Sequence, residues 1–97
     1  RKFEIFGMDC SFPYDEDKGF DEQPQHAGKH PNPQDVFRTD PIDGVSYHST
    51  LQLISAADQF LKVASRATTC SYTIRGKGLL AAKAKALNNT RLLTPDL

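Results

Sequence analysis

The spacing of apolar side chains changes twice between residues 50 and 87. From 50 to 66 apolar residues recur at helical intervals and leave one apolar face. Residues 69–75 alternate instead between apolar and polar side chains, which is the pattern of a half-buried strand. An alanine-rich stretch then runs from 79 to 87 and stops at Asn88-Asn89, which favours a second helix. A helix, a strand and a helix in close succession restrict the chain to the α/β or α+β class.

Shorter stretches add the remaining strands. Residues 2–8 have the alternation of a strand with a bulge at Gly7, and residues 36–39 and 90–97 resemble two further short strands. The order is β–loop–β–α–β–α. We therefore expect a small two-layer sandwich of the α/β class, bordering on α+β, with two helices on one mixed sheet. If the strands pair in parallel, the fold has at least one right-handed crossover.

Two local motifs mark element boundaries. Ser49-Thr50-Leu51-Gln52 has the form of a capping box, in which the Ser49 hydroxyl and the Gln52 side chain satisfy each other's backbone donors at the start of the first helix. Asp43-Gly44 is a turn signal.

The 97 residues are enough for a single small domain, residues 1–97, with an N-terminal strand within 1–12. Residues 13–46 are acidic and carry five prolines without apolar periodicity, which predicts an irregular segment. Residues 47–97 form the compact basic half. The charges are divided accordingly: 1–46 hold ten acids and five bases, a net charge of −5, whereas 47–97 hold seven bases and two acids, a net charge of +5. Such asymmetry indicates a polyanionic partner for the basic half, or two halves that neutralise each other.

The most specific candidate site is Arg75-Gly76-Lys77-Gly78, between the predicted strand and the second helix. Glycines allow close approach to a ligand, and the following helix offers unpaired N–H groups and the positive end of its dipole. Lys83, Lys85 and Arg91 continue the positive charge along the chain, which suits an extended anion such as a nucleic-acid backbone. The spacing is not that of a Walker loop. The alternative is an ordinary glycine turn beside surface lysines.

These residues resemble a known family. The likeness covers about residues 35–90 and is carried by Val36-Phe37-Arg38, the helix at 50–66, Tyr72-Thr73-Ile74, Arg75-Gly76-Lys77-Gly78-Leu79-Leu80 and Lys83-Ala84. Together they resemble the βαβα half of Alba-type nucleic-acid-binding proteins, and most closely the smaller Alba-type subunit of ribonuclease P and MRP. The resemblance implies that Arg75 and Lys77 contact nucleic-acid backbone and that the fold pairs with a like subunit.

Two features depart from that family. A C-terminal β-hairpin is missing, and Asp40-Pro41-Ile42-Asp43-Gly44 stands where the family has a basic cluster. A ribosomal protein of the small-subunit platform shares the strand–glycine loop–helix layout more loosely.

Three aromatic residues occur in and just before the acidic segment. Phe12, Tyr14 and Phe20 lie among carboxylates, a composition typical of segments that become ordered on a protein partner. They would equally suit packing against the chain's own sheet.

Other chemistry has weaker support. His26 and His30, with His48 and Cys10 elsewhere, would be the ligands of a zinc site, but the histidine pair lies among prolines. Residues 15–22 resemble a calcium loop only vaguely. We find no nucleophile motif, and a phosphoryl-transfer enzyme built on the glycine loop lacks a nearby metal-binding acid.

Cysteine content and hydropathy leave the compartment open. Cys10 and Cys70 would form one disulfide or remain two buried thiols. The chain begins with Arg1 rather than Met, which indicates processing or trimming, and it contains no apolar run long enough to span a bilayer. An intracellular location is favoured.

The sequence therefore predicts a non-catalytic RNA- or DNA-binding subunit of a ribonucleoprotein assembly, without cofactor, metal or small-molecule substrate. Its predicted contacts are Arg75, Gly76, Lys77, Gly78, Lys83, Lys85 and Arg91. The alternative is a protein-interaction or structural subunit of a larger complex, including a ribosomal-protein-like role, that uses Phe12, Tyr14 and Phe20.

Overall fold

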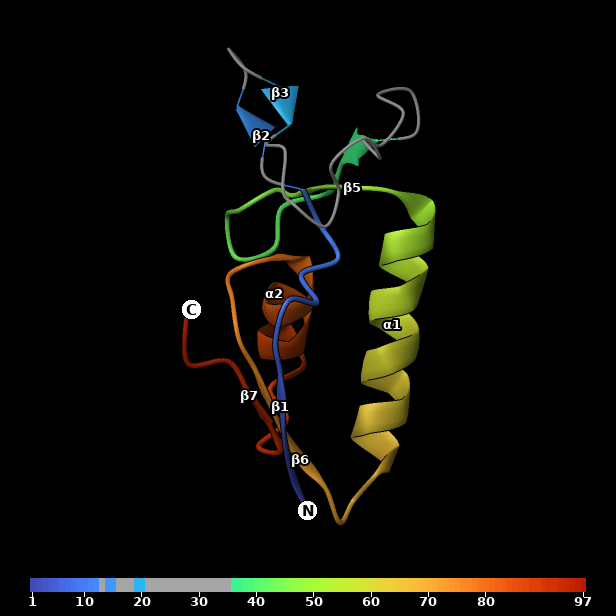
Figure 1. Cartoon of the computed structure of the whole chain (residues 1–97), viewed down its shortest axis with the longest axis vertical. Helices are drawn as coiled ribbons and strands as arrows, with labels where there is room; N and C mark the ends of the chain where they lie inside the picture. The colour runs from blue at the N-terminus through green and yellow to red at the C-terminus, as the bar shows by residue number, and fades with distance from the viewer. Residues whose placement is uncertain (13, 16–18, 21–35) are drawn as a thin grey trace.

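The computed structural model describes residues 1–12, 14–15, 19–20 and 36–97. Its centre is a parallel sheet of three strands in the order β1-β6-β7 (Figure 1). These strands are β1 (Lys2–Ile5), β6 (Ser71–Ile74) and β7 (Leu92–Leu93). Each lies within a stretch that the sequence predicted as a strand, and the register places Tyr72 between Phe3 and Leu92.

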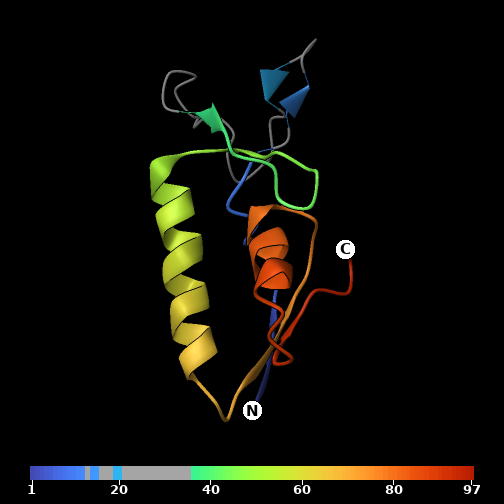
Figure 2. The ribbon, with the colours of Figure 1, turned by 180° about the vertical axis from the view of Figure 1, so that it is seen from behind.

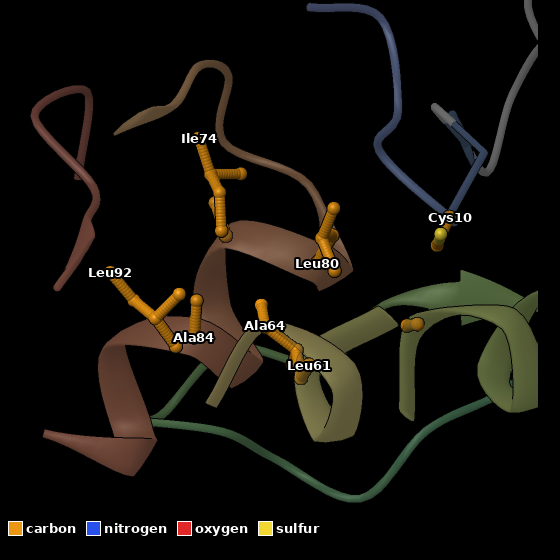
Figure 3. Close-up of a cluster of buried hydrophobic side chains, with 9 residues drawn as sticks. Cys10, Leu61, Ala64, Ile74, Leu80, Ala84 and Leu92 are labelled. Atoms are coloured by element: carbon orange, nitrogen blue, oxygen red, sulfur yellow. The ribbon is translucent and has the colours of Figure 1, made fainter. Parts of the chain in front are cut away.

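Both helices pack on the same face of this sheet. They are α1 (Leu51–Arg66) and α2 (Leu79–Leu87), and both match the predicted ranges to within one residue. One cluster of buried side chains joins α1, α2 and the sheet (Figure 3); it includes Leu61, Ala64, Ile74, Leu80, Ala84 and Leu92. Phe60 of α1 adds an edge-to-face contact with Tyr72, at 5.6 Å between ring centroids. The core therefore consists of small and branched residues between one helical layer and one sheet.

The opposite face of the sheet is polar along β1 and β6, whereas the exposed Leu93 of β7, the register partner of Thr73, shares this face. Alternation along β1 and β6 places Lys2, Glu4, Ser71 and Thr73 away from the helices. Parallel sheets are usually covered on both faces, with strands that are apolar throughout. Here the period of two leaves a polar face on β1 and β6, and the α/β fold has the two layers that the sequence predicted.

Antiparallel strands occur separately from this sheet. β2 (Tyr14–Asp15) pairs with β3 (Gly19–Phe20), and β4 (Phe37–Arg38) pairs with β5 (His48–Ser49). Among the described residues, the parallel and antiparallel pairs that were expected in one sheet therefore belong to three separate sheets. Most of the predicted irregular segment 13–46, including His26 and His30, lies outside the described residues.

The start of α1 differs from the predicted capping box. Thr50 is the N-cap, and its side chain accepts a hydrogen bond from the Leu53 backbone N–H at 3.3 Å. Ser49 belongs to β5, is fully buried, and donates from its hydroxyl to the Cys10 carbonyl at 2.7 Å. Because the Ser49 hydroxyl is bonded to Cys10, the N-cap of α1 is Thr50, one residue later than predicted.

The predicted turns are confirmed. Asp43 and Gly44 have φ angles of 52° and 80° and join Ile42 to Val45, which pair as an antiparallel bridge. Two positive φ angles in succession are those of the tight hairpin turn for which Asp-Gly is suited. Asn88 ends α2 in the left-handed conformation, with φ 57°.

Candidate functional site

The loop before α2 is capped by distant parts of the same chain. Gly76 N–H donates to the Asp96 carboxylate at 2.7 Å. Leu79 N–H donates to the Ser11 hydroxyl at 3.1 Å, and Leu80 N–H donates to the Asp9 carbonyl at 2.9 Å. These backbone donors were expected to bind a phosphate. Each of these three N–H groups already has an acceptor in the same chain, so none of the three is open to a ligand.

The two glycines of this loop accommodate Asp9. A Cβ placed on Gly78 would lie 2.5 Å from the Asp9 Cβ and 2.9 Å from its carbonyl oxygen. A Cβ on Gly76, where φ is 102°, would lie 2.7 Å from a carboxylate oxygen of Asp9. Close approach is therefore required, as the sequence indicated, but the approaching group is the segment that follows β1.

The charges of the loop are divided between paired and exposed groups. Arg75 contacts Glu4 at 3.2 Å and Asp96 at 3.8 Å. Lys77 is exposed and has no ion pair or hydrogen bond from its side chain within the described part of the chain. Two carboxylates, Asp9 and Asp96, thus adjoin the position predicted to bind an anion, and they oppose one there.

Arg91 is committed to the end of α1. Its guanidinium donates to the carbonyls of Ala67 and Ser65 at 2.6 Å each, to Ala64 at 3.2 Å and to Cys70 at 3.3 Å. The last carbonyls of a helix lack partners within the helix, and a cation there also complements the helix dipole. Arg91 thus joins the C-terminal end of α1 to the segment before β7.

Lys83 and Lys85 lie in a different place, along the side of α2. Lys83 Nζ contacts Asp58 Oδ1 of α1 at 2.7 Å, whereas Lys85 is exposed and has no such partner among the described residues. The structure therefore divides the seven predicted contact residues among the α2 start, the α2 side and the α1 end.

Two adjoining hollows follow the side of α2, and together we call them the α2 groove. One, of about 480 Å³, lies between α2 and the hairpin that includes Ile42 and Val45; the other, of about 360 Å³, lies between α2 and α1. Both are bordered by Ile42 and Ala86. In Figure 2 the green hairpin lies beside the start of α2, and α1 lies on the opposite side of α2. The groove is lined by the apolar residues Ile42, Val45, Tyr47, Leu61, Ala82, Ala86, Leu87 and Leu97 and the polar residues Asp43, Asp58, Lys62, Ser65, Lys83 and Lys85.

A third hollow lies on the other side of Ile42. It has a volume of about 300 Å³ and is bordered by Phe37, Ile54 and Leu79, among others. Because Ile42 borders all three hollows, its hairpin meets α1 and α2 without filling the space between them. Apolar surface beside the hairpin consequently remains open.

The predicted partner-binding aromatics lie at the opposite end of the chain. Phe12 is half-buried, and its N–H donates to the His48 carbonyl at 2.8 Å, which ties the N-terminal segment to β5. Tyr14 and Phe20 occur in the paired strands β2 and β3. The backbone contact of Phe12 fits the interpretation that this segment folds back onto its own domain.

Cys10 is a buried thiol with an unusual backbone. Its φ is 59°, and it follows Asp9, which contacts the glycine loop. Burial raises the pKa of the Cys10 thiol above its ordinary value, and the negative charge of Asp9 adds to the effect. Cys10 is therefore a neutral thiol at neutral pH and a poor nucleophile. Of the two alternatives for the cysteines, the disulfide is absent: both thiols are free, with Cys10 buried and Cys70 half-buried.

The described ranges contain no candidate metal site. No three or more His, Cys, Asp or Glu side chains within these ranges are close enough together to hold a metal ion. No described helix has the length and apolar character needed to cross a membrane.

Comparisons with family models, curated proteins and solved structures found no match for this chain. The resemblance to Alba-type proteins therefore stays a prediction.

Sequence reasoning missed the α2 groove. Ile42 and Val45 flank a turn signal and belong to no periodic pattern of apolar residues, so nothing in the sequence places them beside α2. A partial signal does exist. Ala82 and Ala86, four residues apart, leave one side of α2 nearly without side-chain bulk, and Lys85 lies next to that side.

Proposed function

We propose that this chain is a non-catalytic protein-interaction subunit that binds a segment of a partner protein in the α2 groove. The observation that carries the proposal is the open, largely apolar lining between α1, α2 and the hairpin of Ile42. Apolar surface that stays exposed around a hollow is typical of binding sites.

The exposure of individual side chains supports this choice. Val45, Leu87 and Leu97 line the groove and are 51%, 52% and 42% exposed. Single exposed apolar residues are normal on a protein surface. Three around one groove are better explained by a partner that covers them, because burial of apolar area is a main driving force of association.

The loop before α2 is less suited to the phosphate contact predicted for it. The N–H groups of Gly76, Leu79 and Leu80 are bonded, and Asp9 and Asp96 lie against the loop. Binding a phosphate to these three N–H groups would require displacement of their acceptors. The α2 groove needs no such rearrangement.

A selection experiment tests the proposal. The whole chain is immobilised and random peptides displayed on phage are selected against it; selected peptides are then measured in solution by fluorescence polarisation. Ala86→Trp places a large ring between the two hollows and should weaken peptide binding about tenfold or more, since one clash at a packed interface costs at least about 1.4 kcal/mol. Ala56→Trp, at an exposed alanine of α1 that does not line the groove, is the matched control.

Circular dichroism establishes that both variants fold. Selection that yields no specific binders, or binders indifferent to Ala86→Trp, would contradict the proposal.

A second candidate function is binding of RNA or DNA backbone, as a subunit of a ribonucleoprotein assembly. The specific observation in its favour is that Lys77 and Lys85 are exposed without an acidic partner among the described residues. The net charge of +5 over residues 47–97 supports the same function.

Salt titrations against a single-stranded RNA test this candidate. Removal of one lysine that neutralises a phosphate of a single strand lowers the slope of log affinity against log salt by about 0.7. Lys77→Ala/Lys85→Ala should therefore lower the slope by about 1.4, while Lys2→Ala on the polar face of the sheet leaves it unchanged. An unchanged slope in the double variant would exclude these lysines as contacts.

A further inference from the structure

The charges around the α2 groove are unequal. Lys62, Lys83 and Lys85 border it together with Asp43 and Asp58. Lys83 is paired with Asp58 at 2.7 Å. Lys62 and Lys85 remain, both exposed, and only Asp43 opposes them along the lining.

These two lysines belong to different walls. Lys62 is on α1 and borders the smaller hollow, whereas Lys85 is on α2 and borders the larger one. A ligand that occupies both hollows therefore passes between two ammonium groups that have no ion pair among the described residues. Opposite charges at the border of an interface raise the association rate and fix the orientation of the ligand.

The shape of the groove indicates how a ligand would fill it. Its two hollows share Ile42 and Ala86 as borders, and on the α2 side only the small methyl group of Ala86 lies between them. Neighbouring apolar anchors are presented by an amphipathic helix at intervals of three or four residues. The larger hollow is mostly apolar, with only Asp43 and Lys85 as charged lining residues.

We propose that the occupant of the α2 groove is an acidic amphipathic helix of a partner protein. Its apolar side chains would enter the hollows on either side of Ala86, and its carboxylates would face Lys62 and Lys85. This inference rests on the proposed function and specifies the chemistry of the partner.

Two synthetic peptides of equal length test it. Both carry leucines at positions i, i+3, i+4 and i+7; the other positions are mainly glutamate in one peptide and mainly lysine in the other. Fluorescence polarisation with the whole chain should give at least tenfold tighter binding for the acidic peptide. In the Lys62→Glu/Lys85→Glu variant the preference should disappear or reverse, because two attractions become repulsions.

Lys2→Glu is the control variant, since Lys2 is an exposed lysine on the polar face of the sheet. It changes the net charge without changing the groove and should retain the preference for the acidic peptide. On the unmodified chain, NMR chemical-shift changes caused by the acidic peptide should centre on Ala86 and Leu87. This measurement needs no variant to fold.

The outcomes separate the inference from the proposed function. Equal binding of both peptides, abolished by Ala86→Trp, would overturn the acidic partner and leave groove binding intact. The acidic partner would also be overturned, with groove binding intact, if neither designed peptide bound while neutral or basic peptides from the phage selection bound in the groove. Absence of any groove-dependent peptide binding would overturn both. A single-stranded RNA that displaces the acidic peptide and binds more tightly, with loss in Lys62→Glu/Lys85→Glu, would assign these lysines to nucleic acid and overturn the inference.

Discussion

The two ends of the basic stretch 75–91 differ from its middle. At one end the loop of Gly76 and Gly78 meets Asp9, Ser11 and Asp96, and at the other end Arg91 caps α1. In the middle, Lys83 has one surface partner and Lys85 has none among the described residues. Arg75 and Arg91 at the ends thus have contacts within the fold, whereas Lys77 is exposed and Lys83 and Lys85 in the middle border an open groove.

This difference shows that basic residues close in sequence are not equivalent binding groups. Sequence supplies the charge, but the fold decides which charges meet acceptors of the same chain. A guanidinium with five donors can join several carbonyls, whereas an ammonium group on a flexible stem tends to stay solvated. Arg75 and Arg91 have internal contacts and Lys85 has none described, which agrees with this distinction.

The largest expected effect is at Arg91. Arg91→Ala removes four hydrogen bonds to the carbonyls at the end of α1 and should lower the free energy of unfolding by about 3 kcal/mol, since hydrogen bonds to charged groups contribute more than neutral ones. Urea unfolding followed by circular dichroism measures the change. Arg66→Ala, an exposed arginine in the last turn of α1, should cost less than about 1 kcal/mol. Equal changes in the free energy of unfolding for the two variants would mean that Arg91 contributes no more to stability than an ordinary surface arginine.

A smaller effect is expected at Gly78. Gly78→Ala places a Cβ 2.5 Å from the Asp9 Cβ and should destabilise the fold by about 2 kcal/mol, the usual cost of overpacking. Gly44→Ala meets no atom within 4 Å but has a φ of 80°, so its cost of about 1 kcal/mol reports backbone strain alone. The same urea titrations should rank Gly78→Ala below Gly44→Ala in stability. If Gly78→Ala were instead the more stable variant, the segment of Asp9 would be able to move away from the loop, and the loop could open to a ligand.

The fold was largely predictable because its elements are local. The apolar period of α1, the alternation of β6 and the alanine content of α2 each act over a few turns or residues, and the turn at Asp43-Gly44 depends on two adjacent residues. These signals are carried by neighbours along the chain, so no tertiary information is needed to interpret them.

The site was less predictable because its contacts are distant in sequence. Leu80 and Asp9 are bonded across most of the chain, and so are Leu79 and Ser11. The sequence around Leu79 and Leu80 gives no indication that their N–H groups are bonded to Asp9 and Ser11, which follow β1. The capping box failed for the same reason, since the Ser49 hydroxyl is bonded to the carbonyl of Cys10.

The smallest effect is expected in the middle of the basic stretch, at the pair of Lys83 and Asp58. Their side chains are 25% and 60% exposed at an Nζ–Oδ1 distance of 2.7 Å, and exposed pairs of this kind contribute about 0.5 kcal/mol. A double-mutant cycle of Lys83→Ala and Asp58→Ala, measured by urea unfolding, should give a coupling near that value, and Lys85→Ala should leave stability unchanged. A weak coupling leaves Lys83 available to a carboxylate of a bound partner, because exchange of one exposed acceptor for another costs little. A coupling above about 1.5 kcal/mol would instead make Lys83 a structural residue like Arg91, and the distinction between the ends and the middle of the stretch would then hold only for Lys85.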